Sequence, residues 1–216
     1  MASGPTGGSG GSATTTYDVD ALGIPRFVTT DYIDLSAIDR ISRFRSSIGH
    51  DYADDDESCR SMKHYFMPKG GVDWATVAIS SPVTGTIDLT RPDFAGTQIV
   101  IRAQRYPAFT IVLFHVNPAI STAHGTPLTA GQPIGTHIGR VTMSDVAVWV
   151  QTPRGRKLVS WFDVMTDGLF AAYAAHGVTS RQQAIITRAE RDADPLTCNG
   201  ETFLTSGSIN SWIALH

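Results

Sequence analysis

The stretch GTQIVIRAQRYPAFTIVLFHV, residues 96–116, decides the fold class. In its first part apolar side chains such as Ile99 and Ile101 recur at every second position. This period of two is typical of a β-strand that buries one face. The last eight residues, FTIVLFHV, form an apolar run rich in β-branched side chains that is too short for a helix. We therefore expect two strands here.

The same period continues on both sides of this stretch. From Val77 the segment VAISSPVTGTIDLT predicts two short strands, and SDVAVWVQTPRGRKLVSWFDV predicts a hairpin with the turn TPRG at residues 152–155. Several short strands with frequent turn residues indicate antiparallel pairing rather than alternating strand–helix units. The predicted fold is mainly β, an antiparallel β-sandwich.

The C-terminal part has a different pattern, which predicts two helices. Residues 167–177, DGLFAAYAAHG, are rich in alanine and end at a glycine. Residues 180–195, SRQQAIITRAERDADP, begin at a serine and end at a proline. Serine is typical of helix starts, and glycine and proline are typical of helix ends.

Length and charge restrict the class of protein. A chain of 216 residues is long enough for one well-buried core. The formal net charge of −3 argues against a nucleic-acid partner, which requires clustered lysine and arginine. No apolar run approaches the roughly 20 residues that span a bilayer, so we expect no transmembrane segment.

The first 16 residues, MASGPTGGSGGSATTT, contain no large apolar side chain and predict a flexible leader. Residues 17–216 are then a single domain. A leader of this composition is common after the lipidated cysteine of bacterial surface lipoproteins. That interpretation predicts an exported protein, periplasmic, cell-surface or extracellular, with a lipid anchor in its native form. A vector-derived linker is the alternative, and both interpretations stay open.

Cys59 and Cys198 are the two cysteines of the chain. In an exported protein they favour a disulfide that closes a loop of more than 100 residues. Two alternatives stay open. Arg60, Lys63 and His64 lie close to Cys59 in sequence and would favour a reactive thiolate, or both thiols are buried and inert.

The central strands resemble those of lysostaphin-like zinc metallopeptidases over roughly Val77–Val150. The segments ISSPVTGTI, GTQIVI, LFHV, GTPLTAGQPIGTHIG and SDVAVWV follow the order of that family's landmarks. The resemblance implies a small, open β-sandwich of the duplicated-hybrid type, with a metal ion in its groove. GTPLTAGQPIG is shared with biotin-carrier-like barrels, so it indicates fold more than activity.

Carried over by position, the resemblance implies an altered metal site. His115 in LFHV matches the family's lone catalytic histidine, and Asp145 takes the first position of its His-x-His strand. The second position, a zinc ligand in the family, is Ala147, which cannot bind a metal. His64 matches the other ligand histidine, but Pro68 stands where the family has aspartate.

A rearranged site is the resulting hypothesis. Zinc needs about four N, O or S ligands, with one position open to water in catalytic sites. We expect His64, His115, His137 and Asp145 to be the ligands of a divalent metal, most simply zinc. The alternative is that each histidine has only a structural role, as a hydrogen-bonded core or turn residue.

The polar stretch Gly49–Phe66, GHDYADDDESCRSMKHYF, is expected to close one end of the groove as a loop. His50 and Glu57 are candidates for acid–base catalysis beside His115. If these residues have no catalytic role, the run DYADDDE, residues 51–57, is a solvated acidic loop. Trp149 and Trp161 flank the predicted hairpin and either pack in the core or line a face that stacks on sugars.

Two functions follow. The first is an exported metal-dependent hydrolase that cleaves an amide or ester bond in a peptide, glycan or small-molecule substrate, with cell-wall material as one candidate source. The second is a non-catalytic module that binds cell wall, polysaccharide or protein. Ala147 and Pro68 stand where the family has metal ligands, and a relative that lost catalysis and kept a binding role would show such changes. The sequence does not specify the oligomeric state.

Overall fold

The computed structural model describes residues 15–216, so residues 1–14 of the predicted leader lie outside the described residues. The proposed division into a leader and a single domain at 17–216 stays a prediction.

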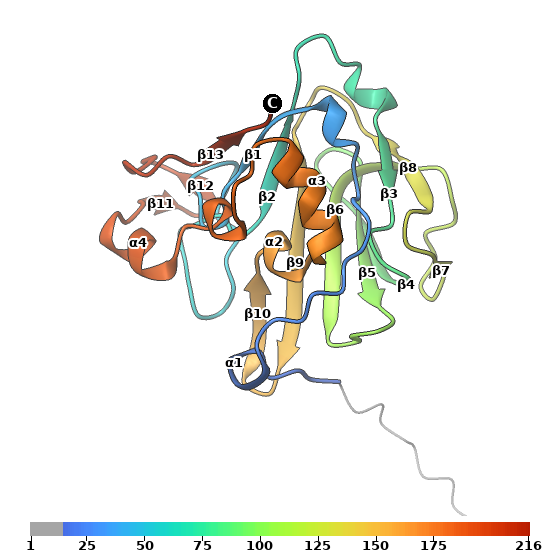
Figure 1. Ribbon diagram of the computed structural model, residues 1–216, viewed down its shortest axis with the longest axis horizontal. Helices are drawn as coiled ribbons and strands as arrows, with labels where there is room; N and C mark the ends of the chain where they lie inside the picture. Colours follow the sequence, from blue (N-terminus) through green and yellow to red (C-terminus); the bar gives the residue numbers. More distant parts are fainter. Residues whose placement is uncertain (1–14) are drawn as a thin grey trace, which may run out of the picture.

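Strands dominate the described chain (Figure 1). They are β1 (Ile38–Ser42), β2 (His64–Pro68), β3 (Ala78–Ser80), β4 (Gly85–Pro92), β5 (Thr97–Ala103), β6 (Phe109–Pro118), β7 (Pro127–Leu128), β8 (Pro133–His137), β9 (Ser144–Thr152), β10 (Gly155–Val159), β11 (Cys198–Asn199), β12 (Thr202–Phe203) and β13 (Trp212–Ala214). One sheet runs in the order β13-β1-β2-β9-β6-β5-β4-β7, with β10 paired to β9 and β8 paired to β3 and β6. All named pairs are antiparallel, which confirms the predicted mainly β, antiparallel fold.

The stretch 96–116 forms two strands of this sheet, as predicted. Ile101 of β5 lies opposite Ile111 of β6, and both side chains are fully buried. The TPRG segment turns the chain from β9 into β10, where Gly155 lies opposite Thr152. Sequence periodicity therefore located the centre of the sheet correctly.

The helices are α1 (Val19–Leu22), η1 (Leu35–Ala37), η2 (Trp74–Thr76), α2 (Trp161–Val164), α3 (Asp167–Ala175), η3 (Arg181–Ala184) and α4 (Arg188–Ala193). Of these, α2 and α3 lie over one face of the sheet, whereas α1 and α4 lie away from that face (Figure 1). Trp161 and Phe162 of α2 pack in the main core with Val146 and Val148 of β9. Since neighbouring strand residues face opposite sides, Asp145, Ala147 and Trp149 point to the other face.

The predicted second C-terminal helix is divided in the structure. Between η3 and α4, Ile185 forms a bridge with Phe44, whose backbone N–H donates to Ala184 and whose carbonyl accepts from Ile186. A new helix then begins at Thr187, which forms a capping box with Glu190. Pairing with a distant segment therefore replaces the helical hydrogen bonds in the middle of residues 180–195.

Candidate functional site

His115 lies where β6 changes neighbours. The strand pairs with β9 as far as Leu113 and with β8 from Val116 onward. Between these two ladders the backbone of His115 has a φ of 59°. A residue other than glycine in this region stores about 1–3 kcal/mol of strain, which the surrounding packing must hold. The bend turns the imidazole toward Asp145.

Asp145 on β9 is the centre of a buried charge cluster, which we define as Lys63, His115 and Asp145. The carboxylate oxygens lie 2.6 Å from Nζ of Lys63 and 3.2 Å from Nε2 of His115. The Asp145 side chain is fully buried. Burial acts to raise its pKa, but the charges of Lys63 and His115 outweigh burial and hold the pKa below its ordinary value. Asp145 is therefore ionised and already neutralised by the protein.

Lys63 is held in an aromatic enclosure. Its ammonium group lies 4.0 Å from the ring centroid of Phe114, 4.7 Å from that of Tyr52 and 5.0 Å from that of Tyr65. It also lies 3.1 Å from Nε2 of His50. The aromatic faces and the Asp145 carboxylate together fix this cation in one place.

His115 presents no free lone pair to a ligand. Its Nδ1 lies 2.9 Å from the carbonyl oxygen of Ala95, and its Nε2 faces Asp145. Nδ1 donates to this carbonyl, and Nε2 lies 3.2 Å from the Asp145 carboxylate, at ion-pair distance. Burial acts to lower the pKa of His115, but the hydrogen bond and charge of Asp145 raise it above the ordinary value. The Asp145 carboxylate therefore favours the protonated form of this imidazole.

His137 lies near the cluster but is directed elsewhere. Its ring centroid is 6.4 Å from that of His115 and 4.6 Å from that of Trp74. Its Nδ1 accepts from the backbone N–H of Gly139, which leaves the proton on Nε2. Burial lowers the pKa of His137 to about 4, so it is neutral.

His64 belongs to the other side of β2. Tyr65 is the residue opposite Asp145, so its neighbour His64 faces away from the cluster. Its Nδ1 donates to the carbonyl of Ser42, its Nε2 accepts from the hydroxyl of Ser160, and burial lowers its pKa to about 4. The predicted set of four is thus not brought together. His115 and Asp145 meet, His137 lies beside them, and His64 is a core residue.

A divalent metal does not fit these side chains as they are arranged. A histidine ligand must offer a neutral ring nitrogen with a free lone pair. The lone pairs of His64 and His137 accept hydrogen bonds from Ser160 and Gly139, and both ring nitrogens of His115 face oxygen atoms of the protein. Over residues 15–216, no three His, Cys, Asp or Glu side chains gather in a way that would hold a metal ion. The positive charge at Asp145 comes from Lys63.

The two acid–base candidates have different places. His50 lines the hollow beside the cluster, where its Nε2 accepts from Lys63 and its Nδ1 donates to the carbonyl of Asp51. Glu57 does not line that hollow. Its carboxylate pairs with Arg45 and Arg60, each at 2.7 Å. Burial acts to raise the pKa of Glu57, but the two arginines lower it, so this carboxylate is a fixed structural anion.

Two adjoining hollows form what we call the groove. The inner hollow, of about 600 Å³, is lined by His50, Lys63 and His115, and by Glu201 from the β11–β12 hairpin. The outer hollow, of about 450 Å³, crosses β4, β5, β6, β9 and β10. They share Tyr52, Arg91 and Gln98. Trp149 lines the outer hollow, whereas Trp161 is fully buried in the core.

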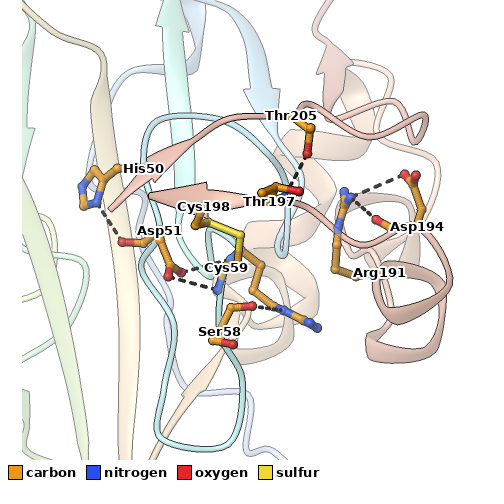
Figure 2. Close-up of a disulfide and its surroundings, with 10 residues drawn as sticks. His50, Asp51, Ser58, Cys59, Arg191, Asp194, Thr197, Cys198 and Thr205 are labelled. Atoms are coloured by element: carbon orange, nitrogen blue, oxygen red, sulfur yellow. Dashed lines mark hydrogen bonds and ion pairs between the residues drawn. A yellow bond between two sulfur atoms is a disulfide. The ribbon is translucent and has the colours of Figure 1, made fainter. Parts of the chain in front are cut away.

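A disulfide fixes one rim of the groove (Figure 2). Cys59 and Cys198 are bonded, as predicted, across a separation of 139 residues, so the reactive-thiol alternative is wrong. The bond attaches the loop that carries His50 to the β11–β12 hairpin. Asp51 strengthens this junction, because its side chain accepts from the backbone N–H groups of Cys59 and Arg60 and its own N–H donates to Glu201.

The position of Lys63 against Asp145 is the feature of the cluster that the sequence did not predict. The resemblance directed attention to His64, its neighbour, and a shift of one residue in a strand exchanges the two faces of the sheet. A signal was present in the aromatic residues Tyr52, Tyr65 and Phe114, but only the folded chain shows that they surround one ammonium group.

In the part of the chain that the structure describes, no helix has the length and apolar character needed to cross a membrane.

Neither a family model nor a curated protein matches this chain. Among solved structures it is similar to a protein described as a glycyl-glycine endopeptidase, LytM, from Ruminococcus gnavus, with 14% identity and a TM-score of 0.39 over 47% of this chain and 44% of that one. It is also similar to a zinc-containing peptidase from Vibrio cholerae, with 17% identity and a TM-score of 0.44 over 66% and 40%.

A third likeness is to the SpoIIQ–SpoIIIAH pore-forming complex, with 12% identity and a TM-score of 0.44 over 68% and 96% of the chains. Two of these three are described as peptidases, the class of protein that residues 77–150 resemble in sequence. This chain spans less than half the length of the first two. At this similarity the likeness says nothing about activity.

Proposed function

We propose that the protein is a non-catalytic binding module of an exported protein, and that its groove holds a polymer derived from the cell envelope. The observation that carries this proposal is the 2.6 Å contact between Lys63 and Asp145. A fixed ammonium group neutralises the carboxylate that a hydrolase of the predicted kind would use to hold its metal. The groove is present, but the positive charge beside Asp145 is the ammonium group of Lys63 and not a metal ion.

The other reactive side chains support the same proposal. Both cysteines form the disulfide, so neither is a nucleophile. Ser160 and His64 are within hydrogen-bond distance at 2.9 Å, but both are almost completely buried and cannot meet a polymer. The disulfide supports export, because such bonds persist in oxidising compartments. Lipid anchoring stays a prediction.

A co-sedimentation assay with purified bacterial cell walls tests the proposal. We expect the oxidised full chain to pellet with the walls and to release neither amino groups nor reducing ends. Trp149→Ala, in the groove, should weaken pelleting, whereas Trp212→Ala, a partly exposed tryptophan on β13 that lines neither hollow, serves as the matched aromatic control. Time-dependent release of amino groups by the wild type but not by Asp145→Asn would refute the proposal.

One observation favours the predicted metal-dependent hydrolase as a second candidate. The strained backbone of His115 lies beside a hollow, and strain of this kind gathers at active sites. Metal binding separates the two functions. We expect protein stripped with a chelator and then dialysed against zinc to contain no stoichiometric metal and to keep its melting temperature. Stoichiometric zinc that raises the melting temperature would favour the hydrolase.

A further inference from the structure

Building on the proposed binding function, we infer that the outer hollow binds an anionic glycan, with carboxylates that pair with Arg91 and Arg156. The ligand class follows from the charges that line this hollow. Three of its side chains are cationic, Arg91, Arg102 and Arg156, and one is anionic, Asp88. The chain as a whole has a net charge of −3, so this region is basic on an acidic protein.

The ion pairs within the hollow leave two arginines available. Arg102 and Asp88 neutralise each other through contacts of 2.8 Å to both carboxylate oxygens. Arg91 and Arg156 are exposed, and neither has a carboxylate partner among residues 15–216. A carboxylate of a ligand would complete their pairing.

Both available guanidinium groups are held in position by neutral neighbours. The Nε of Arg91 donates to the side-chain oxygen of Gln98, which is itself buried. The guanidinium of Arg156 lies over the ring of Trp149, 4.2 Å from its centroid. Each guanidinium group is fixed by a contact that leaves its other N–H groups free. Bidentate recognition of a carboxylate requires two such free N–H groups.

The separation of these arginines sets the length of the ligand. Arg91 lies on β4 and Arg156 on β10, with β5, β6 and β9 between them. Four strand spacings of about 4.8 Å separate them by about 19 Å across the sheet. The pairing registers offset them by about six residues, or roughly 20 Å, along the strands, so the two Cα atoms are about 28 Å apart. A ligand that meets both arginines is therefore an oligomer that runs across the strands.

A glycan suits this floor better than a peptide does. An added peptide strand needs an open sheet edge, but β5, β6 and β9 are each paired on both sides. The floor instead offers side-chain amides, a hydroxyl and an aromatic surface, from Gln98, Gln151, Thr110 and Trp149. Such groups match the hydroxyls and ring faces of sugars.

Titration of the oxidised full chain with oligogalacturonate, monitored by calorimetry, tests the inference. A maltooligosaccharide of equal length, polyglutamate and polyphosphate are the comparison ligands. We expect oligogalacturonate to bind most tightly, and its affinity to fall as salt is added. Arg91→Gln and Arg156→Gln should each weaken binding about tenfold. Arg26→Gln, which makes the same charge change at an exposed pair with Asp167, should have no effect.

The outcomes separate this inference from the proposed function. Equal binding of the neutral oligosaccharide, or binding that both arginine variants retain, overturns the anionic glycan and leaves the binding module in place. Tighter binding of polyglutamate or polyphosphate replaces the glycan with an acidic peptide or a phosphate polymer, and so also overturns it. Cleavage of an envelope polymer contradicts the proposed function itself.

Discussion

Two buried charges of opposite sign meet at Lys63 and Asp145, and each depends on the other. Both side chains are almost fully buried, at 1% and 0% exposure. Removing one charge leaves the other desolvated and unpaired, which costs far more than the pair contributes. Replacing both with apolar groups removes the penalty on each side.

We therefore expect Lys63→Met to lower the free energy of unfolding by about 3–5 kcal/mol. The double variant Lys63→Met/Asp145→Leu should recover most of this loss, because the two buried charges are removed together and His115, without the Asp145 charge that raises its pKa, can become neutral. Urea unfolding at neutral pH measures both values. A single variant as stable as the wild type would mean that water reaches Asp145.

The buried histidines give opposite pH effects. The pKa of His64 is lowered to about 4 by burial, so the unfolded chain takes up a proton that the folded chain rejects as the pH falls from about 6.5 to about 4. The pKa of His115 is raised, so its contribution is complete below about 6.5 and is lost as the pH rises through the folded value.

The two histidines can be distinguished by melting temperature as a function of pH. His64→Gln should lose part of the acid-side decline of the wild type, and His115→Gln should lose part of the decline above neutral pH. Each variant acts as the control for the other. The same change of slope in both variants would contradict the assigned protonation states.

At the scale of elements, the sheet has a covered face and a groove face, and β9 contributes to both. Val146, Val148 and Val150 pack in the main core. On the opposite face Asp145 belongs to the charge cluster, Ala147 packs in a second buried apolar cluster and Trp149 lines the outer hollow. The hairpin β11–β12 is a separate two-stranded unit whose attachment to the groove depends on the Cys59–Cys198 bond.

Removal of the disulfide should therefore loosen one element selectively. In Cys59→Ser/Cys198→Ser we expect a loss of up to about 5 kcal/mol by the chain-entropy estimate. Hydrogen exchange should accelerate at residues 198–203, while β6 stays protected under native conditions. Unchanged exchange in the hairpin would show that the hydrogen bond between Asp51 and Glu201 is sufficient to hold it.

The sequence allowed the central strands to be predicted because burial imposes a local period, as at Ile99, Ile101 and Ile111. It did not allow the charge cluster to be predicted, because Lys63 and Asp145 are joined only by the pairing of β2 with β9. The break in residues 180–195 has the same origin, since Phe44 intervenes from a distant segment. Local patterns located the elements, and long-range pairing determined the site.

At the scale of the whole molecule, the C-terminal segment packs against both the main sheet and a helix. β13 pairs with β1 at the edge of the main sheet, and Ile213 and Leu215 are buried in the core. The backbone of His216 also bonds to His176 at the end of α3. This short segment joins the sheet to the helical layer.

Deletion of residues 212–216 should consequently destabilise the entire fold. Loss of two buried apolar side chains costs about 3–6 kcal/mol, and the edge of β1 is uncovered. Circular dichroism at near- and far-ultraviolet wavelengths should show one coincident transition at a lower temperature. Ile213→Ala should give an intermediate value. A separate early transition would indicate that the segment melts independently.

The bond between Cys59 and Cys198 also has a practical consequence. Protein made in a reducing cytosol would carry two thiols, and the wall of the groove that includes Glu201 would no longer be tethered to the loop of His50. Material of that kind would understate affinity for any polymer, even with every groove residue intact. The free thiols of each preparation should therefore be counted before its binding is measured.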